Sequence, residues 1–318
     1  MTLASVLPCR GQGAVAMGWV TNAAITLLFF LHGAKLSREA ILAGVGHWRL
    51  HILVAASTFI LFPVLGLAIQ ALGRGWIDPG MTAGVLFLCL LPSTVQSSIA
   101  FTSIGKGNVP AAVCSATLSN VAGVFITPLL VGIFLGTYAK GGHSGVDLHS
   151  IEAIALQLLL PFILGHLSRP LTTSFLTRHK TVVGRVDRSS ILLVVYTAFS
   201  AAVVEGLWKR LSAGDIALVL VLDAVLLAVA LVITTLASRL LGFSREDEVA
   251  IVFCGSKKSL ASGVPMAGVL FPPAMVGPLI VPLMLFHQMQ LMVCAVMARR
   301  YAARAAAEGG VVAEPVEA

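Results

Sequence analysis

Residues 251–271 read IVFCGSKKSLASGVPMAGVLF and place two adjacent lysines, Lys257 and Lys258, inside an apolar segment. From Ser259 to Ala298 the chain has no Asp, Glu, Lys or Arg. If this segment crosses a bilayer, each lysine costs about 2.5–3.5 kcal/mol on insertion scales. Lysines at such depth face a water-filled cavity or a partner, so this segment is the first candidate for a functional site.

The composition of the whole chain is that of a membrane protein. Of its 318 residues, 58% are hydrophobic and 11% are charged, whereas a soluble domain has about 25% charged residues. The apolar residues form long runs, which predicts an all-α polytopic membrane fold and not a β-barrel. The net charge of +7 comes from basic residues that collect in loops, so no nucleic-acid partner is expected. The five cysteines are scattered, and neither a disulfide framework, a metal site nor a cofactor is expected.

Nine apolar runs are long enough, or nearly so, to cross a hydrocarbon core of about 30 Å. The odd-numbered loops and the tail, together with Arg49 at the start of the second span and Arg239 at the end of the seventh, hold 14 Lys and Arg residues, and the even-numbered loops hold 4. The positive-inside rule therefore places the C-terminus in the cytoplasm and the N-terminus outside, in the plasma (inner) membrane. The short segment 1–13 has no signal-peptide features, and the tail 305–318 is expected to be disordered. The spans are expected at about 14–32, 48–70, 79–104, 109–135, 151–168, 189–207, 214–240, 246–271 and 274–298.

Two of these spans are interrupted by polar residues. Pro92 ends an apolar run in the third span, and Gly255 ends one in the eighth. The polar clusters that follow align at an offset of 161 residues, Gln96–Ala100 against Lys257–Ala261, and a long helix with few charges follows each. The copies lie five spans apart, so they are inverted across the membrane. Paired broken helices in inverted repeats point to a transporter binding site, and the breaks are predicted to lie close together at mid-membrane.

Polar residues at the breaks and in the helices that follow them are the candidate substrate- and ion-binding residues. At a break, exposed N–H groups attract anions, while C=O groups and nearby hydroxyls can hold a cation. The alternative is that small polar residues only allow close helix packing. The candidates are Ser93, Thr94, Gln96, Ser97, Ser98, Asn108, Asn120, Ser256, Lys257, Lys258, Ser259, His287, Gln288 and Gln290.

The two lysines would point about 100° apart on a helix. One can therefore line the site while the other pairs with Asp223, the only carboxylate inside the seventh span. The inward lysine can bind an anionic substrate directly, or its ammonium can take the place of a coupling cation. A desolvated lysine can also exchange protons.

Three blocks of the chain, residues 29–67, 90–120 and 253–272, resemble the bile acid:sodium symporter family and most closely its divergent bacterial branch. The resemblance covers about residues 14–301. It implies ten helices in two inverted five-helix repeats, with two crossing broken helices. Thr21–Leu36 match the family's second helix, so this chain is expected to lack the first one, through a real loss or a late start codon.

The same resemblance divides the single transporter domain, 14–318, into two parts. It implies a core made of about 48–135 and 214–301, and a panel made of about 14–33 and 151–207. The lipid bilayer and a small organic anion are the expected partners, and the oligomeric state is left open.

The departures from the family pattern concern the coupling ion. Sodium-coupled members carry a glutamate and a glutamine at the second break, where this chain has Phe253 and Lys257. The family's Ser-Asn pair at the first break corresponds to Ser97-Ser98. These changes argue against sodium coupling and favour Lys257 as a tethered cation, with a sodium or proton gradient left open as the driving force.

The leading hypothesis is therefore a secondary active transporter in which core moves against panel to give alternating access. A non-transporting membrane regulator is the first alternative. An intramembrane hydrolase is the second, and it requires Ser256 or Ser259 within hydrogen-bond reach of a lysine. No oxyanion device accompanies either serine, so the chain is not expected to be an enzyme.

Overall fold

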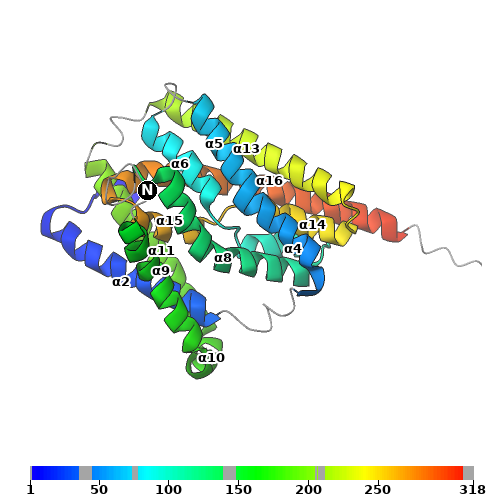
Figure 1. Cartoon of the computed structure of the whole chain (residues 1–318), viewed down its shortest axis with the longest axis horizontal. Coiled ribbons are helices and arrows are strands. Elements are labelled where there is room, and N and C mark those ends of the chain that lie inside the picture. Colours follow the sequence, from blue (N-terminus) through cyan, green and yellow to red (C-terminus); the bar gives the residue numbers. More distant parts are fainter. Residues whose placement is uncertain are drawn as a thin grey trace, which may run out of the picture.

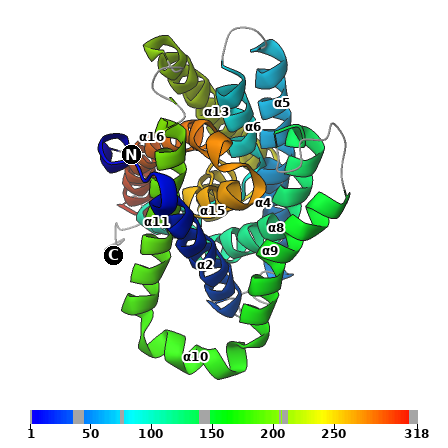
Figure 2. The ribbon, with the colours of Figure 1, turned by 90° about the vertical axis from the view of Figure 1, so that its left-hand side faces the viewer.

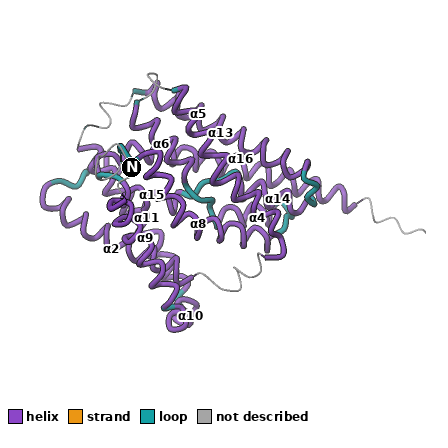
Figure 3. The backbone as a smooth tube through the Cα atoms, in the orientation of Figure 1, coloured by secondary structure: helices purple, strands orange, loops and turns teal. Residues whose placement is uncertain are grey.

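The computed structural model describes residues 2–35, 45–73, 78–138, 148–204, 206 and 212–310, and within them the chain is helical with no strand (Figure 3). In this part of the chain, six helical segments are long and apolar enough to cross a membrane. This confirms the prediction of an all-α polytopic membrane protein. The six are α2 (Gly11–Lys35), the continuous α4–η2–α5 segment (Trp48–Leu72), α8 (Val109–Leu135), α11 (Lys180–Val204), α13 (Ala213–Leu240) and most of α16 (Pro273–Gly310).

The third predicted span consists of two short helices, α6 (Pro79–Leu90) and α7 (Gln96–Ile104). Helix α6 ends because Pro92 has no N–H to donate and disfavours a helical conformation for the residue before it. Leu91 is accordingly extended, with ψ of 155°. The helix resumes only at Gln96, which confirms the break predicted near Pro92–Gln96.

The eighth predicted span is broken in the same way, into α14 (Arg245–Gly255) and α15 (Leu260–Leu270). Ser259 caps α15 by accepting a hydrogen bond from the Ser262 N–H at 3.1 Å. The break near Gly255–Lys257 is therefore confirmed. Lys257 and Lys258 lie in the non-helical link between the two half-helices, so the expected 100° separation on a helix was wrong.

The two breaks lie against each other, as predicted. Ser98 Oγ donates to the Phe253 carbonyl at 2.8 Å, and the Ser259 N–H donates to the Pro92 carbonyl at 2.9 Å. The offset of 161 residues that relates the two polar clusters also relates Ser98 to Ser259 and Pro92 to Phe253. A third bond, from Ser93 Oγ to the Cys254 carbonyl at 2.5 Å, joins two further positions with this offset.

The helices form two groups that pack against each other. Helices α2, α9 (Leu148–Leu167) and α11 lie together, and α10 (Arg169–Arg178) joins the ends of α9 and α11 (Figure 2). The larger group contains the α4–η2–α5 segment, both broken helices, α8, α13 and α16 (Figure 1). The α4–η2–α5 segment consists of α4 (Trp48–Ala56), η2 (Ser57–Leu61) and α5 (Phe62–Leu72). Two short elements precede it, α1 (Thr2–Val6) at the start of the chain and η1 (Val45–His47) directly before α4.

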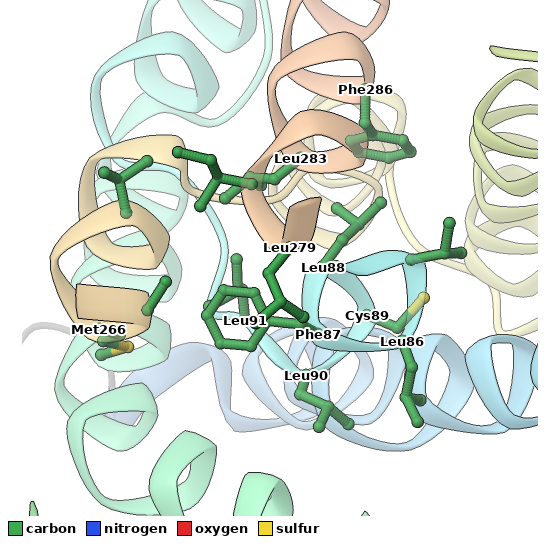
Figure 4. Packing of buried hydrophobic residues seen from close by; sticks show 14 of the residues in the cluster. Leu86, Phe87, Leu88, Cys89, Leu90, Leu91, Met266, Leu279, Leu283 and Phe286 are labelled. Carbon is green, nitrogen blue, oxygen red and sulfur yellow. The ribbon is translucent and has the colours of Figure 1, made fainter. Parts of the chain in front are cut away.

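Helix α6 lies at the centre of the larger group. Every residue from Met81 to Leu91 is buried, including the lone hydroxyl of Thr82. Figure 4 shows Leu88 on the side of α6 that faces Leu279, Leu283 and Phe286 of α16, while Leu86 and Leu90 lie on its other side. A helix that is apolar all round belongs in such an interior. The break at its end therefore opens inside the protein, where freed backbone groups need protein partners.

One end of the molecule gathers several loops that the sequence assigns to the same side of the membrane. The Arg49 guanidinium donates to the Leu241 carbonyl at 3.1 Å, and the Asn108 N–H donates to the Glu246 carbonyl at 2.8 Å. At this end Glu248 accepts two hydrogen bonds from Arg239, both at 2.9 Å, and one from the Tyr301 hydroxyl at 2.8 Å. These bonds tie the ends of α13, α14 and α16 together.

Two predicted boundaries differ from the structure. Residues 169–188 were expected to be a loop, but α10 and the first two turns of α11 occupy most of this segment. The tail expected to be disordered from 305 is helical as far as Gly310, and 311–318 lie outside the described residues. Both segments are charged or rich in alanine, and such sequences continue a helix after its apolar run has ended.

Candidate functional site

A cavity of about 390 Å³ lies where the two groups of helices meet. The α2–α9–α11 group supplies one wall, and the first break, α8 and α15 supply the other. Its polar lining on the broken-helix side consists of Thr94, Gln96, Thr117, Asn120, Ser259 and Ser262. Its apolar lining includes Leu28, Phe29, Val121, Val124, Phe162, Ile191 and Met266. Both walls of the cavity thus offer polar as well as apolar groups to a ligand.

Two half-helices begin at this cavity. Gln96 is the first residue of α7, and Ser259 is the N-cap of α15, and both line the cavity. The first turn of a helix has N–H groups without helical partners, and the helix dipole places partial positive charge there. Two such ends on one wall favour a ligand with negative charge.

The opposite wall carries charged side chains from α2 and α11. Lys35 and Asp187 form an ion pair, and His32 lies one turn before Lys35. Arg188 also lines the cavity, and within the described part of the chain it makes no ion pair or hydrogen bond. With Asp187 paired to Lys35, no carboxylate of the described residues compensates the positive charge of the Arg188 guanidinium at the cavity.

Asn120 connects the first break to the start of α15 by hydrogen bonds. Its Nδ2 donates to the Ser93 carbonyl at 2.6 Å and to the Ala116 carbonyl at 3.1 Å. Its Oδ1 accepts a hydrogen bond from Ser262 Oγ at 2.8 Å. One side chain on α8 therefore fixes the first break and the start of α15 relative to each other.

Lys257 and Lys258 are fully buried, and neither lines the cavity. The Lys257 ammonium lies 3.3 Å from Ser97 Oγ, and 4.6 Å and 5.6 Å from the ring centroids of Phe101 and Phe253. The Lys258 ammonium donates to three backbone carbonyls. Neither lysine contacts Asp223, which is fully buried in α13, so the pairing considered from the sequence is not formed.

Of the predicted site residues outside the breaks, Gln290 and His287 lie beside the second break. Gln290 Oε1 accepts from the Lys258 N–H and its Nε2 donates to the Lys258 carbonyl, both at 2.9 Å, and His287 lies beside it. Gln288 of the same predicted cluster is exposed. Asn108 caps α8 and donates to Asp247 at 2.8 Å, away from the cavity.

The serines proposed for a hydrolase do not meet a lysine. Ser256 Oγ donates to the Val252 carbonyl at 2.6 Å, and Ser259 Oγ interacts with Ser262. Among the described residues, Ser97 is the serine whose hydroxyl contacts a lysine ammonium. The geometry that nucleophilic catalysis requires is therefore not formed at either candidate.

Sequence reasoning missed several residues that the fold brings to the cavity. His32, Lys35, Thr117 and Arg188 were not among the candidate site residues, and all four line the cavity. The run of basic residues in 178–188 was the available signal, but it was interpreted as a topology signal. Only the packing of α2 and α11 against the breaks places these side chains at one site.

Comparisons with known proteins show which family the chain resembles. The sequence profile of the SBF-like CPA transporter family matches residues 1–303. The chain is 59% identical over 302 residues to an uncharacterized protein of Pseudomonas aeruginosa, and the alignment covers 95% of this chain and 90% of that protein. It is 54% identical over 299 residues to YfeH of Escherichia coli, whose name describes a symporter, covering 94% and 89%. It is 28% identical over 282 residues to the sodium/bile acid cotransporter 7 of Danio rerio, covering 87% and 82%.

Proposed function

Because the chain belongs to the SBF-like CPA transporter family, we propose that it is a secondary transporter of a small organic anion. The cavity at the breaks supports this proposal most strongly, since two half-helices begin there opposite Arg188, which has no ion-pair partner among the described residues. Its apolar lining suits the hydrocarbon part of such an anion. The family match confirms the resemblance to bile acid:sodium symporters at the level of the family.

The transport cycle proposed is alternating access by movement of a core against a panel. The panel comprises α2, α9 and α11, the core comprises the remaining spans, and the cavity lies at their boundary. Nine membrane crossings result if each broken helix counts as one. The paired bonds between Ser98 and Phe253 and between Ser259 and Pro92 support two inverted repeats, because the offset of 161 residues relates both partners.

In the proposed orientation the protein spans the inner membrane and its C-terminus lies on the cytoplasmic side. Lys35 and Arg188 lie at the ends of their helices that are closest to the predicted cytoplasmic loops. The charged side of the cavity then faces the cytoplasm, as in an inward-open state.

Transport is proposed to proceed without sodium. At the second break Phe253 packs against Phe101 and Tyr301, where sodium-coupled relatives carry a carboxylate. A fixed ammonium and a sodium ion about 4 Å apart would repel each other by several kcal/mol at an effective dielectric near 20. The positive charges of Lys257 and Lys258 therefore both disfavour binding of a sodium ion at the breaks.

Uptake into proteoliposomes tests these proposals. A set of small carboxylates and sulfonates that includes cholate is supplied with a sodium gradient, with a proton gradient, or with choline replacing sodium. We expect uptake of at least one anion to be the same in sodium and in choline. Uptake that occurs strictly in sodium would contradict the absence of sodium coupling, and no uptake of any anion would count against the transport function.

A further inference from the structure

The Lys258 ammonium occupies a small site built from backbone carbonyls. It donates to the Leu91 carbonyl at 2.7 Å, to Thr58 at 2.8 Å and to Cys89 at 2.9 Å. Its nitrogen also lies 4.2 Å from the centroid of the Phe62 ring. We propose that these carbonyls and this ring form a monovalent-cation site of the broken-helix group, which Lys258 fills permanently with its own ammonium.

The local sequence explains why these carbonyls are free. In η2 the Phe62 N–H donates to the Ser57 carbonyl, a π-helical bond between residues five apart. In the same register the Thr58 carbonyl would accept from Pro63, which has no N–H. Its carbonyl therefore has no backbone donor in the helix ladder and is available to a cation.

The other two carbonyls are freed by the first break. A continuing helix would pair the Cys89 carbonyl with the Ser93 N–H, but that N–H donates to Ser119 Oγ at 3.0 Å. Leu91 lies beyond the end of α6 in extended conformation, so its carbonyl has no helical donor either. The negative end of the α6 dipole adds to the attraction for positive charge.

The site has the chemistry of a primary ammonium. An ammonium has three N–H donors and no acceptor, and here each donor has one carbonyl. The aromatic face adds a cation–π contact, which is strongest when the cation is desolvated. Among the described residues no carboxylate contacts the Lys258 ammonium, so these dipoles and this ring are what offset its burial.

Lys257 next to it lacks such a site. Among the described residues its ammonium has one hydroxyl partner at 3.3 Å and two aromatic neighbours, and no backbone carbonyl. The two lysines are equally buried and adjacent in the chain, so Lys257 is a matched control. The role of tethered cation was expected for Lys257, but Lys258 has the contacts that stabilise a buried ammonium.

Filling the site from within has a consequence for coupling, and this part rests on the proposed function. The three carbonyls come from η2, from α6 and from the first break, and the lysine comes from the second break. A cation here holds all of these elements together. Because it is covalently attached, it cannot be carried across the membrane with the substrate, and a sodium ion cannot take its place.

The test uses the full chain purified in detergent and needs no transport substrate. Thermal unfolding is followed with a thiol-reactive fluorescent dye, since Cys89, Cys114, Cys254 and Cys294 are buried. K258A is expected to melt below wild type, because it leaves three buried carbonyls unpaired. Methylammonium chloride should raise the melting temperature of K258A along a saturating curve, because it binds the folded state alone.

Two comparisons make this result specific. Tetramethylammonium chloride, which has no N–H donor, should leave K258A unchanged, and methylammonium should leave K257A unchanged. K258M fills the site with a side chain of similar length that lacks N–H donors. It should melt below wild type and not respond to methylammonium, and it serves as the test protein if K258A does not fold.

The proposal is overturned if K258A or K258M melts at the wild-type temperature. It is also overturned if methylammonium stabilises K258A no more than tetramethylammonium does, or stabilises K257A equally. Since transport is not measured, these outcomes are independent of the test of the proposed function.

Discussion

Replacing Gly33 by alanine is expected to remove most of the folded protein from the membrane. A Cβ atom at this position would lie 1.9 Å from the Phe162 carbonyl oxygen and 2.8 Å from its carbon. The contact is reciprocal, because a Cβ at Gly165 would lie 2.0 Å from the Phe30 carbonyl oxygen. The clashing atoms belong to backbone, so no side-chain rotation relieves the overlap. Small residues that allow such approach are a main source of helix association in membranes.

The amount of monodisperse protein and its melting temperature measure this effect. Overpacking a well-packed contact costs about 1–3 kcal/mol or more, and here α2 and α9 must separate. Gly18→Ala is the control, since it lies on the same helix and a Cβ there meets no atom within 4 Å. If Gly33→Ala melts like Gly18→Ala, α2 and α9 do not pack as the structure describes.

Replacing Arg188 by glutamine is expected to weaken apparent affinity for the transported anion by about 10- to 100-fold. A hydrogen bond to a charged group contributes about 1.5–3 kcal/mol, which corresponds to this range. Arg188 lines the cavity and has no protein partner among the described residues, so its charge is available to the ligand. The concentration dependence of uptake in proteoliposomes gives the affinity.

Arg185→Gln is the matched control for Arg188. It removes the same charge from the same helix, and Arg185 is exposed and does not line the cavity. Its affinity should stay near that of wild type. An equal loss in both variants would indicate a general effect of surface charge, and no loss in either would remove Arg188 from the site.

The sequence predicted the breaks because their causes are local. Pro92 cannot continue a helix, and a run of polar residues after Gly255 cannot pack as an apolar span. The polar clusters after the two breaks align at an offset of 161 residues, and this repeat predicted that the breaks lie close together. Asn120 and Ser259 were predicted as site residues for the same reason, and both line the cavity.

The parts that sequence could not give depend on packing between distant segments. The choice between Lys257 and Lys258 follows from the position of the Thr58 carbonyl, 200 residues away. The assumption of a helix at the lysines gave a wrong direction for both side chains. The charged residues of the cavity were missed, because hydropathy ends a span where its apolar run ends, while the helix α11 also includes Arg185 and Arg188.

Access to the cavity from both faces of the membrane tests the central claim most directly. Thr117 is partly exposed at the cavity wall, and Thr117→Cys in a Cys9→Ser background places a reactive thiol there while the other cysteines are buried. The measurement is the rate of labelling by a membrane-impermeant maleimide in right-side-out and in inside-out vesicles. Alternating access predicts that the Thr117→Cys variant is labelled in both preparations, as core and panel expose the cavity to each face in turn. Labelling from one face only would contradict a transporter and favour a non-transporting membrane protein.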